Sequence, residues 1–170
     1  MIVDPPQNLD DLKPASAPEP RRWAKTLLSR FQDSFSDVSY DLAWYSDSVN
    51  AQAFLYRGRK RVRLYGGLAR HRRISRAGIA FALAHETGHH LAGAPFDPTY
   101  FWLSSEARSD EWAFFEGMIR VFGSKRGREM AIKGMQELIV LSPVGDISLT
   151  QRERFMCKHG RVTMPSRASS

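Results

Sequence analysis

An unbroken apolar run over residues 77–84 constrains the fold of this chain more than any other feature. Ser75 can cap a helix over residues 76–92, which contain no proline, and Gly93 can end it. Because such a helix would be apolar on every side, we expect it to be buried rather than to lie on the surface. Other elements must therefore surround it.

The pattern H-E-x-x-H follows this run directly, as His85-Glu86-Thr87-Gly88-His89. On a helix, His85 and His89 lie one turn apart on the same face, so both imidazoles can reach one Zn²⁺ at about 2.0–2.1 Å. Glu86 would lie close enough to accept a proton from water on that metal. Burial of these groups is unfavourable unless a partner satisfies them, and a metal would do so. The pattern predicts a zinc centre; a chance match is the alternative.

A second acidic pattern predicts the rest of this centre. Two serines precede a predicted helix over residues 106–122, where Glu106, Asp110, Ala113 and Gly117 form one stripe. Small residues on that stripe would let the helix approach the histidine helix closely. Glu106 would then complete a His₂Glu zinc site, and Asp110 could accept the spare N–H of a ligand histidine. An ordinary acidic first turn, stabilised by the helix dipole, is the alternative.

Together, H-E-x-x-H and E-x-x-x-D resemble the gluzincin zinc metallopeptidases, of which thermolysin is the familiar member. The preceding sequence narrows this resemblance to the catalytic domain of CAAX-prenyl-protease and HtpX-type peptidases, over residues 49–117. There an N-A-x-A segment, here Asn50-Ala51-Gln52-Ala53, forms the edge strand beside the cleft, and a second strand ends in Gly67-Leu68. The resemblance implies a small zincin-like α+β domain, and an endopeptidase that binds a peptide or protein substrate as an added strand along Asn50, Ala51, Gln52 and Ala53.

The chain departs from those membrane peptidases in two ways. Its apolar runs are far shorter than the 18 residues of a membrane span, so it is closer to the soluble proteins called minigluzincins. No His-Pro pair follows Ser142-Pro143 where the family places the residue that stabilises the transition state, and no such residue is carried over.

The coarse pattern predicts a short antiparallel sheet, the H-E-x-x-H helix and the glutamate-bearing helix. Strands are expected over 38–45, 51–56 and 61–65, with a basic turn over 57–60, and further helices over 21–35, 125–141 and 150–158. Residues 1–20 hold five prolines and should form a mobile arm, residues 21–160 a single domain, and residues 161–170 a frayed tail.

The net charge of +7 supports a rival interpretation. Basic residues gather in the runs 57–63 and 70–76, and such clusters can contact nucleic-acid phosphates or attract acidic proteins. Nucleic-acid binding is disfavoured because no recognition motif accompanies them. Within the second run His71 should be solvated, whereas His90 should be buried and hydrogen-bonded.

Two further alternatives keep the zinc. The chain also resembles ImmA/IrrE-type regulatory proteases, although those carry Asn where this chain has Asp110. The second alternative is a basic protein that contains zinc and binds a partner without catalytic activity. Glu86 disfavours it, because a structural zinc site needs no general base. The single cysteine, Cys157, and the absence of a signal-peptide pattern favour the cytoplasm.

Overall fold

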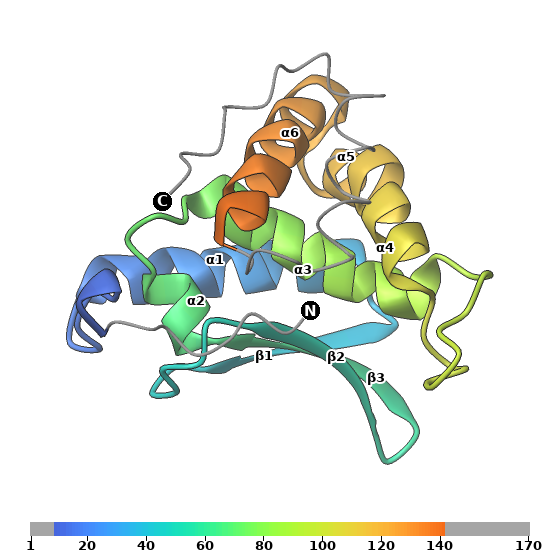
Figure 1. Ribbon diagram of the computed structural model, residues 1–170, viewed down its shortest axis with the longest axis horizontal. Helices are drawn as coiled ribbons and strands as arrows, with labels where there is room; N and C mark the ends of the chain where they lie inside the picture. Colours follow the sequence, from blue (N-terminus) through green and yellow to red (C-terminus); the bar gives the residue numbers. More distant parts are fainter. Residues whose placement is uncertain (1–8, 142–170) are drawn as a thin grey trace, which may run out of the picture.

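The computed structural model describes residues 9–141. Figure 1 shows a sheet on one side of the molecule, with helices covering one of its faces. Helix α3 (Arg76–Leu91) runs between the sheet and a second group of helices, namely α4 (Glu106–Trp112), α5 (Met118–Phe122) and α6 (Ser124–Leu141). The predicted α+β class is confirmed.

The sheet contains three strands in the order β1-β3-β2: β1 (Val38–Ala43), β3 (Arg59–Tyr65) and β2 (Ala51–Tyr56). β2 and β3 pair antiparallel, but β1 and β3 pair parallel, so the prediction of an antiparallel sheet is wrong for one of the two pairs. β3 occupies the central place, and its Val62 and Leu64 are fully buried.

A tight turn joins β2 to β3. Its two residues, Arg57 and Gly58, have φ angles of +50° and +74°, and positive φ at both positions matches the twist of a hairpin. The turn is shorter than the predicted span 57–60, because Arg59 already pairs with Tyr56. Within the described residues no further strand pairs with the other side of β2, which is therefore an edge strand.

Helix α3 begins where predicted, since Ser75 Oγ accepts a hydrogen bond from Ala77 N at 3.1 Å. Glu137 of α6 reinforces this cap: its Oε2 accepts from the backbone N and the Oγ of Ser75, at 2.9 and 3.0 Å. Every residue from Ala77 to His90 is buried, so the helix is enclosed by the fold. Gly134 permits the close approach of α6, because a Cβ there would lie 2.4 Å from Ala77 O.

The N-terminal segment packs on the domain. Its first described turn is η1 (Leu9–Asp11), and after it Lys13 N donates to Arg70 O at 2.9 Å while Leu12 is buried. Helix α1 (Pro18–Ser34) starts earlier than the expected residue 21, because proline suits a first helical turn. The prediction of a mobile arm over residues 1–20 is therefore wrong from Leu9 onward.

His71, which we expected to be solvated, is buried beside this segment at the end of α2 (Gly66–Arg70). Its Nδ1 accepts a hydrogen bond from Arg73 N at 3.2 Å. Burial lowers the pKa of His71; the charge of Asp11 opposes this effect and that of Arg73 adds to it. The imidazole is thus held in its neutral form.

The predicted helix over 106–122 is confirmed as one continuous rod, in which a π-helical turn, η2 (Ala113–Gly117), joins α4 to α5. Helix α6 matches the predicted span 125–141. The predicted helix over 150–158, the domain end at 160 and the tail over 161–170 lie outside the described residues. In the described part of the chain, no helix has the length and apolarity needed to cross a membrane.

Candidate metal centre

Helix α3 places the H-E-x-x-H side chains together at its C-terminal end. His85, Glu86 and His89 are all buried, and each offers a possible ligand atom within 4.8 Å of the other two. The imidazole rings of His85 and His89 lie 4.7 Å apart between centroids and nearly perpendicular, at 88°. This is the one-turn spacing that the sequence predicted.

Glu106, in the first turn of α4, faces both histidines. Its Oε2 lies 3.1 Å from His85 Nε2, and its Oε1 lies 3.5 Å from His89 Nε2. Ligand atoms around a tetrahedral metal with bonds of about 2.0–2.1 Å are separated by about 3.3 Å. Both distances from Glu106 therefore match the separation between two ligand atoms of one zinc ion.

The other ring nitrogens of the two histidines are held by the segment at and just before α4. His85 Nδ1 lies 2.6 Å from Asp110 Oδ1. His89 Nδ1 lies 2.7 Å from the backbone oxygen of Ser104 and 3.1 Å from Ser109 Oγ. Because carbonyl and carboxylate oxygens only accept, both Nδ1 atoms carry a proton, which leaves each Nε2 as the nitrogen that could bind a metal.

Ser104 and Ser109 were absent from the predicted site. A backbone carbonyl leaves no trace in the sequence, so the role of Ser104 has no sequence signal. Ser109 lies one residue before Asp110, and the helical stripe that singled out Glu106 and Asp110 does not include it. Its contact arises because α4 crosses close to the end of α3.

The close crossing requires a glycine at position 88. A Cβ at Gly88 would lie 2.9 Å from Ser109 O, which is closer than real Cβ atoms come, and 3.1 Å from Ser109 Cα, which is tighter than most real contacts. The small residues predicted on the facing helix also meet α3: Ala113 is fully buried, and a Cβ at Gly117 would lie 3.4 Å from Ala84 Cβ. The backbones can therefore approach until Asp110 reaches His85.

The charges of this cluster favour a cation. Burial alone lowers the pKa of His85, but the carboxylates of Asp110 and Glu106 outweigh it and raise the pKa to about 9. Burial raises the pKa of Glu106, and the two histidines reverse this, so the carboxyl is strongly acidic. Among the described residues, His85 Nε2 is buried without a well-formed hydrogen bond. The arrangement fits a divalent metal, which would satisfy that nitrogen and balance the carboxylates.

Glu86 connects the cluster to the sheet. Its Oε2 accepts a hydrogen bond from Ala53 N of β2 at 2.7 Å, and its Oε1 lies 4.0 Å from His85 Nε2. The latter distance is longer than those made by Glu106. Glu86 is thus placed beside the metal position rather than within its ligand set.

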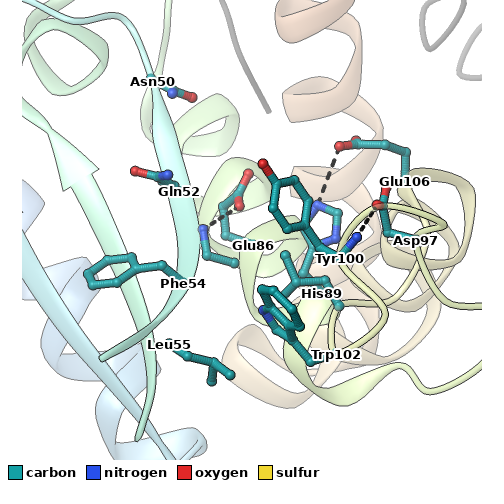
Figure 2. A pocket seen from close by; sticks show the side chains of 12 residues that line it. Asn50, Gln52, Phe54, Leu55, Glu86, His89, Asp97, Tyr100, Trp102 and Glu106 are labelled. Atoms are coloured by element: carbon teal, nitrogen blue, oxygen red, sulfur yellow. Dashed lines mark hydrogen bonds and ion pairs between the residues drawn. The ribbon is translucent and has the colours of Figure 1, made fainter. Parts of the chain in front are cut away.

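A cleft of about 430 Å³ opens between the edge of β2 and the loop that precedes α4, and Figure 2 shows Glu86, His89 and Glu106 within it. Of the predicted substrate-binding residues, Asn50, Gln52 and Ala53 line this cleft, while Ala51 is fully buried. The first basic run, over 57–63, directly follows strand β2, which lines the cleft. The second basic run, over 70–76, leads into the start of α3, whereas His85 and His89 lie toward the other end of that helix.

His90 lies on another face of α3, as predicted. Its ring is buried, and Nε2 donates to Arg61 O on β3 at 2.9 Å. It is therefore a structural contact between helix and sheet. Cys157 lies outside the described residues.

The chain matches no model of a protein family, and comparison with curated proteins and with solved structures finds no match either. Function must therefore be inferred from the residues of the site rather than from a relative.

Proposed function

We propose that this protein is a zinc-dependent endopeptidase. One observation carries the proposal: the two Nε2 atoms of His85 and His89 and the carboxylate of Glu106 converge at 3.1 and 3.5 Å, the separations expected around one tetrahedral metal. Three protein ligands leave a fourth position for water, which is the pattern of a catalytic rather than a structural zinc. A cytoplasmic location remains an expectation from the sequence.

Zinc bound by these three residues would lower the pKa of a coordinated water toward about 7 and polarise the substrate carbonyl. Glu86 is positioned to move the proton. Its Oε2 accepts a hydrogen bond from Ala53 N, its Oε1 lies 4.0 Å from His85 Nε2, and the residue lines the cleft. Oε1 would accept the proton of the attacking water and return it to the amine that leaves.

The edge of β2 supports a peptide substrate rather than a small molecule. Tyr65 N donates to Asn50 O at 3.1 Å, and the alternation of an antiparallel ladder then directs the backbone groups of Ala51 and Ala53 away from β3. Ala53 N already donates to Glu86 Oε2 at 2.7 Å, so an extended peptide that adds as a further strand would pair with the other backbone groups of this edge. Asn50 Oδ1, buried without a hydrogen-bond partner among the described residues, could accept an N–H of that peptide.

Metal content and turnover test the proposal together. The purified protein should contain one zinc per chain and cleave an unstructured protein such as casein, and chelation should abolish the cleavage. Glu106→Ala should lose the zinc, because only two ligands remain. Glu116→Ala, which removes an exposed carboxylate from η2 in the same rod, should keep both properties. A wild-type protein that cannot be loaded with zinc would refute the proposal.

A further inference from the structure

The loop between α3 and α4 exposes an unusual amount of aromatic surface. Four ring-bearing residues within seven positions are largely accessible: the exposed fractions are 53%, 52%, 74% and 43% for Phe96, Tyr100, Phe101 and Trp102. Two of them, Tyr100 and Trp102, also line the cleft. Clustered apolar surface of this kind usually marks a place where another molecule binds.

Hydrogen bonds hold this loop in shape without burying its rings. Asp97 Oδ1 accepts from the backbone N of Thr99 and of Tyr100, at 2.8 and 2.7 Å. Asp97 N donates to Leu103 O at 2.8 Å, and Ser104 N donates to His89 O at 2.8 Å. The aromatic wall is therefore built before any ligand arrives, which reduces the ordering that binding requires.

The opposite wall of the cleft is the edge of the hairpin. Figure 2 shows Leu55 and Phe54 of β2 on one side, with Tyr100 and Trp102 on the other and Glu86 between them. Leu55 is 43% exposed, although its residue type favours burial. A side chain that enters between Leu55 and Trp102 would meet apolar surface on both sides, immediately beside the proposed zinc position.

Beyond Leu55 the same strand edge leads to positive charge. Arg57 lies four residues after Ala53, or about 13 Å along an extended strand. Among the described residues, Arg57, Arg59 and Lys60 make no ion pair, whereas Arg61 and Arg63 are both paired with Asp41. The hairpin tip thus keeps its charge available to a peptide that follows the strand.

We propose that the preferred substrate is an extended peptide with a bulky apolar residue next to the cleaved bond and an acidic residue about four positions away, opposite the hairpin tip. The juxtaposition of the aromatic wall, the Leu55 edge and the unpaired tip carries this proposal, which rests on the proposed peptidase activity. A peptide antiparallel to β2 would bring its N-terminal side to the tip, and a parallel one its C-terminal side. The side on which an acidic residue helps therefore reports the direction of binding.

Quenched fluorogenic peptides on one scaffold test the proposal. They differ only at the residue beside the cleaved bond (Phe or Ser) and at the fourth residue on either side (Glu, Gln or Lys). For the zinc-loaded protein, Phe should exceed Ser in kcat/KM by about tenfold or more. Glu should exceed Gln by about threefold on one side only, and this difference should vanish at about 0.5 M salt.

Charge reversal at the tip supplies the control. The double variant Arg57→Glu/Arg59→Glu should prefer Lys over Glu at the same position. The matched variant Arg126→Glu/Arg128→Glu changes two exposed arginines of α6 and should retain the preference for Glu. Cleavage with equal rates for Phe and Ser, or a preference for Glu that survives reversal at the tip, would overturn the inference.

Binding separates failure of the inference from failure of the proposed activity. Fluorescein-labelled versions of the same peptides are titrated against the Glu86→Gln protein and followed by anisotropy. The same order of affinities should appear there without turnover. If the wild type cleaves none of the peptides but the variant shows this order, the recognition stands and the peptidase assignment falls. If the wild type cleaves the peptides but the Glu86→Gln variant binds them all with equal affinity, the peptidase assignment stands and the proposed recognition falls.

Discussion

The candidate metal centre and the rim of the cleft are held in place in different ways. At the centre, the Nδ1 atoms of His85 and His89 are each fixed by an acceptor at 2.6 and 2.7 Å, and the side chains are buried. At the rim, backbone hydrogen bonds fix the loop, and rings such as Phe101 remain in solvent. The buried histidine cluster is suited to holding ligand atoms in fixed positions, and the exposed rings of the rim are suited to contacting different peptides.

The difference predicts how the two regions respond to substitution. Changes at the centre should alter zinc affinity or turnover, since each group there acts on another buried group. Changes at the rim should alter substrate affinity and leave zinc and folding unchanged, because few contacts within the protein are lost.

The largest effect is expected for Glu86→Gln, which keeps the shape of the side chain but removes the proton acceptor. Turnover of a cleaved peptide should fall by about 10³-fold, within the usual contribution of general acid–base catalysis. Zinc content, measured by mass spectrometry on the same sample, should stay at one per chain. A variant that remains active would exclude Glu86 as the base.

A smaller effect is expected for Asp110→Asn. The amide cannot hold His85 Nδ1–H as a carboxylate does, so zinc affinity should fall by about 10–100-fold. Competition with a chromogenic chelator measures this. Asp97→Asn, a carboxylate in the loop outside the ligand set, is the matched control and should bind zinc as the wild type does. Equal affinities for both variants would remove Asp110 from the site.

Trp102→Ala sharpens the comparison from the rim. Loss of one wall of the cleft should raise KM for the Phe peptide by about tenfold, with kcat nearly unchanged, since the contact forms equally in the bound and transition states. The zinc content and the melting temperature should match those of the wild type. A loss of zinc would show that the rim supports the centre and that the two regions are not separable.

The smallest effect is expected on the pH dependence of stability, because the pKa values of the buried His85 and His71 shift in opposite directions. Carboxylates raise the pKa of His85, whereas burial lowers that of His71 below about 6.5. A lowered pKa in the folded state means that the unfolded chain binds the proton more readily, so His71 stabilises the fold above about pH 6.5. That contribution should be lost as the pH falls from about 6.5 toward the lower pKa of the folded state.

Urea unfolding at about pH 7.5 and 5.5 measures the loss. His71→Gln provides the reference: the wild type should lose more stability than this variant over the same interval. The difference isolates His71 because His85 and His90 are present in both proteins. An equal loss would mean that the folded environment of His71 does not disfavour its charged form.

Local patterns predicted the parts of the fold that short-range geometry governs. Ser75, the apolar run before His85 and the spacing of Glu106 and Asp110 each act within a helix, where residues three or four positions apart share a face. The hairpin was recognisable for the same reason, although its turn is two residues shorter than expected.

Long-range contacts account for the errors. The parallel pairing of β1 with β3 is a contact between segments far apart in the chain, and a strand's own residues do not reveal its neighbours. Residues 1–20 were expected to be mobile because of their prolines, but within the described part of this segment Lys13 N donates to Arg70 O, far along the chain. His71 was misjudged for the same reason, because that segment covers it.

The sequence by itself determined a buried helix with two histidines and a glutamate on it, and a following helix with two carboxylates one turn apart, because helical periodicity fixes these relations locally. Only the tertiary structure decided that Glu106 meets both Nε2 atoms, that the Ser104 carbonyl and Ser109 hold His89, and that the edge of β2 faces an aromatic wall. Those relations depend on how closely α4 crosses α3 at Gly88, a distance that packing sets and composition does not.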